Sequence, residues 1–316
     1  MSPTTVATLA ARHGADTSAV WPDGLPERFS FDGFPDFARQ YLFNLQLLRT
    51  GDDLETIVVA LAQQLAANRV RYAEVTSTVF THLASGLSAA DYGTALNKGR
   101  RRARDEHGVA LSWVIDIPRD LEWPDSTVTT DFLASANAPD GTIGIGLGGY
   151  EVGFPPEPYG PAFAAATALG LQSLPHAGET EGPTSIVGAL DVLGARRIGH
   201  GVRCLEDAEL TRRLRDTGIV LEVCPTSNVL LGVCTSIEAH PVRRLIDAGA
   251  RVTLNTDDPG SFATDLTTEL ELVHTYHDVS LDDLLALQST ALDASFAPAD
   301  VRAAIGAELS AYPRLT

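Results

Sequence analysis

The residues best suited to chemistry in this chain come directly after short apolar segments of the kind that form β-strands. The run 168–174 leads into Pro175-His176-Ala177-Gly178-Glu179, which places an imidazole and a carboxylate three residues apart. A neutral histidine can bind a metal ion, and a glutamate with a raised pKa can transfer a proton. A histidine at a single strand end is more often a hydrogen-bonded structural residue, so the interpretation depends on the other strand ends.

Other strand ends carry side chains of the same kinds. They are found in Gly148-Gly149-Tyr150-Glu151, Gly199-His200-Gly201, Cys224-Pro225-Thr226-Ser227-Asn228 and Asn255-Thr256-Asp257-Asp258-Pro259. Asp257 and Asp258 by themselves would also suit the cap of a following helix. In a parallel barrel the carboxyl ends of the strands share one rim, so we expect two histidines, a glutamate and two aspartates to meet there.

This set of side chains predicts a catalytic metal site. Histidine and carboxylate ligands that leave one position open suit Zn²⁺, which lowers the pKa of bound water to about 7. A second histidine could hold or deprotonate that water, and Glu179 could protonate the electrophile. Lys98 is the only lysine and lies in a predicted helix, far from any strand end. We therefore expect one metal ion, with no modified lysine to bridge a second one, and no lysine Schiff base.

The elements that must position these residues alternate between strand and helix. We predict strands at 70–76, 109–116, 143–149, 168–174, 197–201, 218–224 and 251–256. We predict helices at 3–13, 37–48, 54–67, 89–107, 127–136, 159–170, 183–193, 206–217, 241–248, 265–275, 281–288 and 298–309. Strands that alternate with helices at spacings of roughly 25–40 residues indicate βα units and a parallel sheet.

The βα units favour a (β/α)8 TIM-type barrel that forms a single domain over residues 1–316. A dinucleotide-binding sheet is disfavoured, because the glycine-rich run 144–149 lacks the spacing of the G-x-G-x-x-G fingerprint and the helix that should follow it. Only seven strands are predicted where the barrel needs eight, so we expect its first strand to be missing from this chain.

Composition narrows the class of function. Of the 316 residues, 44% are hydrophobic, and the formal net charge is -18. Nucleic-acid backbones need clustered Lys and Arg, so we expect no nucleic-acid partner. No run approaches the ~20 apolar residues of a membrane span, and the N-terminus lacks the features of a signal peptide. Cys204, Cys224 and Cys234 form no C-x-x-C motif. We predict a cytoplasmic protein with free thiols and a small-molecule partner.

Four of these motifs together resemble the adenosine deaminase family of metal-dependent hydrolases. They are His176-Ala177-Gly178-Glu179, Gly199-His200-Gly201, Cys224-Pro225-Thr226-Ser227-Asn228 and Asn255-Thr256-Asp257-Asp258-Pro259. Their order and spacing match the family, and the resemblance extends from Ser2 to about Leu309. It implies an amidohydrolase-type barrel and the hydrolytic deamination of a 6-aminopurine nucleoside, such as adenosine, to the 6-oxo product and ammonia.

The resemblance also implies roles for single residues. The cofactor would be one Zn²⁺ ion that activates water, with His176 and Asp257 among its ligands. Glu179 would protonate purine N1, and His200 would orient or deprotonate the water. The substrate contacts would come from Asp258, which accepts from the N7 side of the ring. The other contact would be the backbone of Gly149, which meets N3.

Two features depart from the family pattern. Family members begin with a strand that carries His-x-His and supplies two further metal ligands, and this sequence contains no His-x-His. We therefore expect such a strand to precede Met1 in the natural protein, and little or no deaminase activity if 1–316 is the whole product. Thr76 follows Glu74-Val75 where an Arg is common, which affects contacts to the sugar.

Other substrates and another class of function stay open. Adenine, or an aminodeoxyfutalosine-like nucleoside of menaquinone synthesis, would fit the same chemistry. A metal-poor family member that binds a nucleoside without turning it over is the alternative, and metal analysis would separate it. We expect Tyr150 and the loop 154–156 to border the pocket. His13 is a poor substitute ligand, and we interpret His274 and His277 as surface or packing residues.

Overall fold

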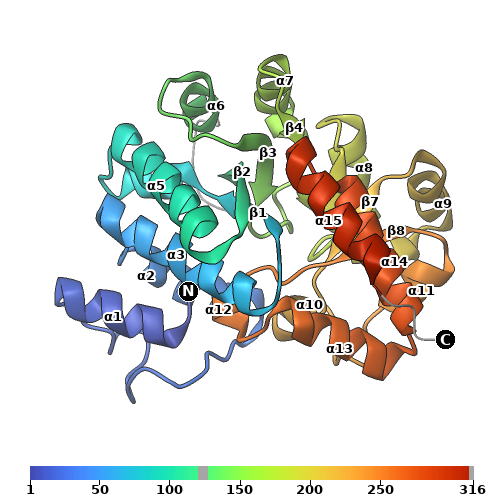
Figure 1. Cartoon of the computed structure of the whole chain (residues 1–316), viewed down its shortest axis with the longest axis horizontal. Coiled ribbons are helices and arrows are strands. Elements are labelled where there is room, and N and C mark those ends of the chain that lie inside the picture. The colour runs from blue at the N-terminus through green and yellow to red at the C-terminus, as the bar shows by residue number, and fades with distance from the viewer. Residues whose placement is uncertain (120–126, 313–316) are drawn as a thin grey trace.

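Parallel strands surrounded by helices make up the fold (Figure 1). The computed structural model describes residues 1–119 and 127–312. Its strands are β1 (Tyr72–Ser77), β2 (Ala110–Pro118), β3 (Thr142–Gly148), β4 (Gln172–Ser173), β5 (His176–Ala177), β6 (Arg197–His200), β7 (Val220–Val223) and β8 (Arg251–Leu254). They form two four-stranded sheets, ordered β1-β2-β3-β4 and β5-β6-β7-β8, with every pairing parallel.

The segment that leads to His176 joins the two sheets. Leu174 donates its N–H to the Ile145 carbonyl of β3 over 2.9 Å, whereas the Pro175 carbonyl accepts from Gly199 of β6 over 3.0 Å. Pro175 has no N–H of its own, so the strand is split there into β4 and β5. The seven predicted strands are therefore present as eight pieces. The prediction that this strand begins at residue 168 was wrong, because Ala168 is the last residue of a helix.

Helices precede and follow the strands along the chain. They are α1 (Pro3–His13), α2 (Gly33–Leu45), α3 (Gly51–Ala67), α4 (Val79–Ala84), α5 (Ala89–His107), α6 (Thr127–Ala134), α7 (Gly160–Ala168), α8 (Pro183–Asp191), α9 (Ala208–Thr217), α10 (Pro225–Leu230), α11 (Val242–Asp247), α12 (Pro259–Phe262), α13 (Leu266–His277), α14 (Leu281–Ala294) and α15 (Ala299–Ala311). Short 3-10 helices lie at Glu157–Tyr159 and Val202–Glu206. No helix in the described ranges has the length and apolarity that crossing a bilayer requires.

The capping residues of α1 explain why its bounds could be predicted from the sequence. The Ser2 hydroxyl accepts from the Thr5 N–H over 3.2 Å, and Gly14 ends α1 at a φ of 60°. Both are ordinary capping devices, and the predicted bounds of this helix are confirmed. α4, α10 and α12 were not predicted. Of these, α10 and α12 closely follow strands of the second sheet and start with a proline, which the first turn of a helix tolerates.

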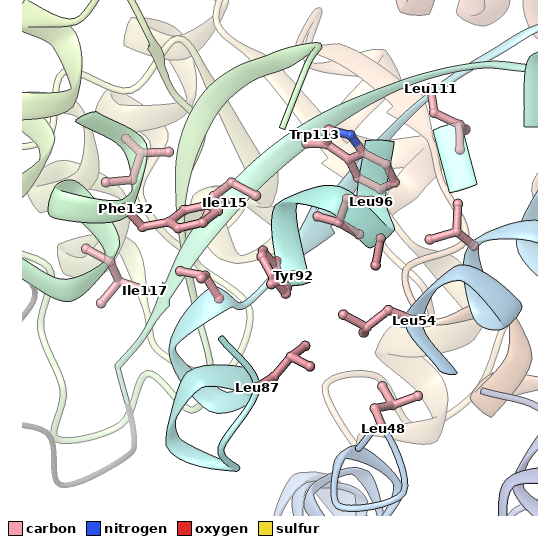
Figure 2. Packing of buried hydrophobic residues seen from close by; sticks show 14 of the residues in the cluster. Leu48, Leu54, Leu87, Tyr92, Leu96, Leu111, Trp113, Ile115, Ile117 and Phe132 are labelled. Carbon is pink, nitrogen blue, oxygen red and sulfur yellow. The ribbon is translucent and has the colours of Figure 1, made fainter. Parts of the chain in front are cut away.

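Each sheet has its own apolar core. The larger core packs β1 to β3 against α1, α3 and α5, with Trp113 and Ile115 of β2 against Tyr92 and Leu96 of α5 (Figure 2). A second core packs β5 to β8 against the helices that follow them, around Leu221 of β7. Among the described residues, no strand pairs with the outer edge of β1 or of β8. The shared strand direction brings all carboxyl ends to one side of the sheets.

Candidate active site

A pocket of about 640 Å³ lies at the carboxyl ends of the strands. All six residues predicted for the site line it: Gly149, His176, Glu179, His200, Asp257 and Asp258. They come from the ends of β3, β5, β6 and β8, which are far apart in sequence. The pocket therefore contains the mixture of imidazoles and carboxylates that the strand ends predicted, on one side of the sheets.

His176 is held so that one ring nitrogen is available. Its Nδ1 lies 3.2 Å from the carbonyl oxygen of Leu147. A carbonyl can only accept, so this bond puts the proton on Nδ1 and leaves the Nε2 lone pair for another partner. Metal-binding histidines are commonly oriented in this way. Gly199 faces the ring from β6, and a Cβ at that position would lie 2.8 Å from Cδ2 of His176. Glycine thus gives the ring its space.

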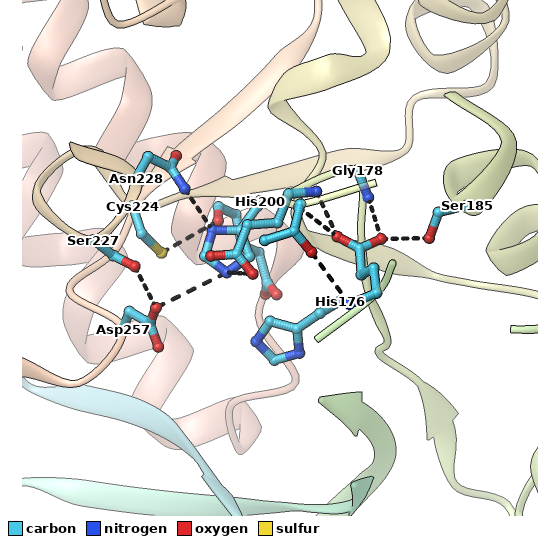
Figure 3. A network of polar contacts seen from close by, with 12 residues as sticks. His176, Gly178, Ser185, His200, Cys224, Ser227, Asn228 and Asp257 are labelled. Carbon is cyan, nitrogen blue, oxygen red and sulfur yellow. Dashed lines mark hydrogen bonds and ion pairs between the residues drawn. The ribbon is translucent and has the colours of Figure 1, made fainter. Parts of the chain in front are cut away.

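Asp257 completes a group of potential metal ligands. It follows β8 at a φ of 54°, and its Oδ2 accepts from the Ser227 hydroxyl over 2.7 Å. Ligand atoms of Asp257, His200 and Cys224 all lie within 4.8 Å of one another, and the rings of His176 and His200 are 5.3 Å apart (Figure 3). Imidazole and carboxylate are donors that Zn²⁺ accepts, so the free Nε2 of His176 and the carboxyl group of Asp257 fit a divalent metal ion. Burial raises the pKa of Cys224, so this residue lies beside them as a thiol. The sequence indicated only a small strand-end residue at this position.

Glu179 is buried and surrounded by negative charge. The residue is 5% exposed, and its Oε2 lies 3.6 Å from Nε2 of His200. Burial, followed by the charges of Asp257 and Glu151, raises the pKa of Glu179 from 4.5 to about 8. The carboxyl group therefore carries a proton at neutral pH, which is the state that a general acid needs.

Glu151 anchors the loop that carries Glu179. Its Oε1 accepts from the N–H groups of Glu179 at 2.7 Å and Thr180 at 2.9 Å. Its Oε2 accepts from the N–H of Gly178 at 2.9 Å and from the Ser185 hydroxyl. Glu151 is 2% exposed. A single carboxylate thus satisfies three successive backbone donors, which fixes the turn after β5.

Arg119 supports the same loop from the end of β2. Its guanidinium donates to the His176 carbonyl, and Nη1 lies 3.9 Å from Oε2 of Glu151. Burial acts to raise the pKa of Glu151, but the Ser185 hydroxyl, the Arg119 charge and the backbone donors lower it overall. At neutral pH Glu151 is therefore ionised, whereas Glu179 is protonated. Sequence reasoning placed Glu151 at a strand end but gave it no role, because its donors come from a different strand end.

His200 lies between Glu179, the proposed acid, and Asp257, the proposed metal ligand. It is 2% exposed, at a φ of 62°, and its Nε2 is 3.9 Å from Oδ2 of Asp257. Burial lowers the pKa of His200, although the nearby carboxylates act in the opposite direction. Its Nδ1 lies 3.1 Å from Nδ2 of Asn228 (Figure 3). The ring is therefore neutral and fixed by hydrogen bonding.

Three further residues of the pocket are Asp258 after β8, Gly149 after β3 and Asp116 of β2. Burial and the neighbouring charge of Asp257 raise the pKa of Asp258 to about 7. Asp258 precedes α12, yet its side chain makes no capping hydrogen bond, so the capping interpretation is not supported. Gly149 has a φ of 97°, which glycine adopts without strain. Asp116 was not predicted: it is 6% exposed, lines the pocket, and accepts from the Thr78 hydroxyl over 2.5 Å.

Aromatic side chains from α2 form one wall of the pocket. Phe34, Phe37 and Tyr41 line it. Tyr150 reaches the site only indirectly, through its ring contact with Phe34 at 5.2 Å. Phe154 is 38% exposed, and no residue of the loop 154–156 is among the described residues that line the pocket. The prediction that this loop borders the pocket was therefore wrong.

Side chains interpreted as structural have structural partners. Nε2 of His13 lies 2.9 Å from a carboxylate oxygen of Asp53, and His277 donates from Nε2 to the Ile237 carbonyl over 2.7 Å. Lys98 is exposed on α5 and is not among the pocket residues. The expectation that no lysine reaches the site is confirmed for the described residues.

The sequence is similar to known deaminases over nearly its whole length. The sequence model of the family described as adenosine deaminase matches residues 1–312. The chain is 39% identical over 316 residues to the aminodeoxyfutalosine deaminase of Streptomyces avermitilis. That alignment covers 98% of this chain and 87% of its relative.

Solved structures show the same fold. The adenine deaminase of Arthrobacter aurescens matches with a TM-score of 0.92 and 28% identity, over 98% of this chain and 94% of that one. An amidohydrolase from Burkholderia ambifaria with bound Zn matches with a TM-score of 0.86 and 27% identity, over 98% and 86% of the two chains. The α/β fold with parallel strands is thus of the TIM-barrel type. This chain belongs to the metal-dependent adenosine deaminase family, and it is a hydrolytic deaminase.

Proposed function

We propose that the chain deaminates a 6-aminopurine, which reacts with water to give the 6-oxopurine and ammonia. The observation that carries the proposal is the buried carboxyl group of Glu179, whose pKa of about 8 keeps it protonated beside His200 in the pocket. The relatives named above support it, because they are an aminodeoxyfutalosine deaminase and an adenine deaminase.

The proposed chemistry assigns one task to each side chain. Glu179 gives its proton to purine N1, which draws electrons from C6. The oxygen of water forms a bond to C6 and gives one proton back to the Glu179 carboxylate. The remaining hydroxyl proton passes to the amino group, the C6–N bond breaks, and ammonia leaves. His200 contacts the attacking oxygen, and the backbone of Gly149 meets N3. N7 of a purine substituted at N9 can only accept, so the protonated form of Asp258, whose pKa is raised to about 7, donates to it. Each contact positions the ring so that C6 faces the attacking oxygen.

We propose Zn²⁺ as the cofactor, with one ion held by His176 and Asp257. When bound, such an ion lowers the pKa of water to about 7. The free Nε2 of His176 and the clustered donors around Asp257 support this assignment. Metal analysis of the purified chain, before and after a chelator, tests it. Bound zinc that restores lost turnover supports the assignment, whereas turnover that survives complete removal of metal contradicts it.

We further propose that the substrate is an adenosine-like nucleoside, with a substituent on N9. The pocket volume of about 640 Å³ falls within the range of roughly 300–1,000 Å³ that holds drug-sized ligands, so a substituted purine fits. Asp116 and Thr78 add hydrogen-bonding groups suited to sugar hydroxyls on the side next to β3. Adenosine and aminodeoxyfutalosine both carry such a substituent, and adenine does not.

A substrate panel tests the proposed function. The Zn²⁺-supplied chain is offered adenosine, aminodeoxyfutalosine and adenine, and the ultraviolet shift of deamination and the ammonia released are measured. Turnover of either nucleoside supports the full proposal. Turnover of adenine alone removes the nucleoside assignment but keeps 6-aminopurine deamination. Binding of all three without turnover would instead identify a nucleoside-binding family member.

A further inference from the structure

A chain of three hydrogen bonds runs from the backbone of α11 to the ring of His200. The Val242 N–H donates to Nδ1 of His240 over 3.2 Å. Nε2 of His240 lies 3.1 Å from Oδ1 of Asn228, and Nδ2 of Asn228 lies 3.1 Å from Nδ1 of His200. His240 is 3% exposed and Asn228 is fully buried. Neither is among the described residues that line the pocket, so both act from behind the site.

The direction of each bond follows from the first donor. A backbone N–H can only donate, so Nδ1 of His240 accepts and the proton of this ring lies on Nε2. Burial lowers the pKa of His240 to about 3, which keeps the ring neutral. Its Nε2 proton goes to Oδ1 of Asn228, so the NH2 of that amide faces His200. Nδ1 of His200 then accepts, and its own proton lies on Nε2.

The surroundings of His200 disfavour the opposite tautomer. A proton on Nδ1 would face the NH2 group of Asn228, and two buried donors would be left without an acceptor. The Nε2 lone pair would then face Oδ2 of Asp257 at 3.9 Å, an oxygen that already accepts from the Ser227 hydroxyl. The amide of Asn228 on one side of the ring and this acceptor on the other therefore favour a proton on Nε2.

We infer that Asn228 and His240 are positioning residues that hold His200 as a hydrogen-bond donor toward the pocket. The inference rests on the proposed deamination and specifies what His200 does within it. With Nδ1 bonded to Asn228 and Nε2 protonated, His200 has no lone pair with which to take a proton from water. It donates from Nε2 to the oxygen that attacks C6 and fixes the position of that atom.

The direct test reads the position of the proton. The full chain is labelled with ¹⁵N in its histidines, supplied with Zn²⁺, and studied by long-range ¹H–¹⁵N correlation spectroscopy. This spectrum distinguishes a protonated ring nitrogen from an unprotonated one. The signals of His200 are assigned by their loss in a His200→Asn variant. We expect a protonated Nε2 and an unprotonated Nδ1. A proton on Nδ1, alone or together with one on Nε2, overturns the inference.

Two variants test whether the chain of hydrogen bonds is the cause. Asn228→Asp keeps the shape of the side chain but replaces its NH2 with an acceptor, so His200 should gain a proton on Nδ1. His240→Ala removes the donor that orients Asn228, so His200 should show a mixture of tautomers. His274→Ala, an exposed histidine on α13, is the matched control and should leave the His200 signals unchanged. An unchanged His200 spectrum in both variants overturns the inference.

Kinetics test whether the arrangement serves the reaction. Asn228→Asp should lower kcat by about 10²–10³, the usual effect of losing one preorganised donor, while KM changes by less than about threefold. Asn228→Asp combined with His200→Ala should lose no more than His200→Ala alone, because one residue acts through the other. Additive losses overturn the positioning role. If the unsubstituted chain deaminates no aminopurine, the proposed function fails, and the proton position is still decided by the spectrum of that chain.

Discussion

Three strands of the first sheet, β1, β2 and β3, are longer than any strand of the second. β2 has nine residues and β3 has seven, whereas β6, β7 and β8 have four each. The long strands support the larger apolar core, and residues of β1 and β2 also line the pocket. The short strands end at the residues proposed for catalysis. The difference shows that a strand stops where a reactive side chain must leave the sheet.

The backbone angles at the strand ends also differ between the two sheets. In the second sheet His200 ends β6 at a φ of 62°, and Asp257 follows β8 at a φ of 54°. Non-glycine residues adopt such angles only where the surrounding structure imposes them. In the first sheet the residue after β3 with a positive φ is a glycine, Gly149. His200 and Asp257 are thus two of the five non-glycine residues with a positive φ in the described part of the chain, and the other three, Arg69, Ala263 and Asp278, lie outside the proposed catalytic set.

The largest expected effect is a loss of turnover in a variant that keeps the packing of the site. Glu179→Gln keeps the shape of the side chain but removes the proton that it donates, so turnover should fall by about 10²–10⁴. The measurement is kcat from the ultraviolet shift, with circular dichroism to confirm folding. Glu157→Gln, at an exposed position, is the control and should keep full activity. A loss of less than about tenfold in Glu179→Gln would show that another group supplies the proton.

A packing change in the first sheet should lower the stability of the fold and leave turnover unchanged. Ile115 of β2 is fully buried in the larger core, so Ile115→Ala should lower the free energy of unfolding by about 2–5 kcal/mol. The kcat of the folded fraction should stay the same. Urea unfolding measures the first quantity. Leu281→Ala on α14, where the side chain is half exposed, should change it by no more than about 0.5 kcal/mol. A parallel loss of kcat per folded molecule would mean that the two sheets are not independent.

A third change weakens the loop of the second sheet alone. Glu151→Gln puts an NH2 group where one carboxylate oxygen accepts, which should lower the free energy of unfolding by about 1–3 kcal/mol. Amide hydrogen exchange should become faster at residues 178–180, with no change in β2 or β3. Ser185→Ala removes only one donor and should have a smaller effect. Uniformly faster exchange in Glu151→Gln would contradict a local role.

Taken per pH unit, the smallest expected effect is a pH dependence of the metal-free chain. Folding raises the pKa of Glu179 from 4.5 to about 8, so the folded state binds this proton more tightly than the unfolded chain does. The stabilisation from this proton is complete below pH 4.5 and is lost as the pH rises toward about 8. The slope is at most about 1.4 kcal/mol per pH unit. Thermal unfolding should show a steeper fall over this window than in Glu179→Gln. Equal slopes would contradict the raised pKa.

Much of the fold could be predicted from the sequence because strong local signals agree with the final packing. Ser2 and Gly14 define the first helix, and apolar runs between helices define the strands. Short elements were missed for a physical reason. α10 has six residues and α12 has four, too few for a helical period to be visible. Pro175 split a strand by removing one N–H, an effect that depends on its neighbours in the sheet.

The site could be predicted in part for the same reason. Parallel strands place their carboxyl ends together, so the type and position of six residues sufficed to gather them. The supporting residues could not be found in this way. Glu151 binds N–H groups nearly thirty residues away in the chain, and His240 acts through Asn228. A sequence shows which groups could react, whereas the partners of a buried polar group depend on tertiary packing.

The left-handed backbone at His200 and Asp257 also has an evolutionary consequence. Asparagine adopts this conformation more readily than most residues do, and one base change converts a histidine or an aspartate codon into an asparagine codon. Such a substitution would remove the imidazole or the carboxyl group without adding strain to the backbone of the turn. A gene copy released from selection would therefore lose its enzymatic role in one mutational event and still encode a well-folded binding protein, ready to be recruited for another purpose.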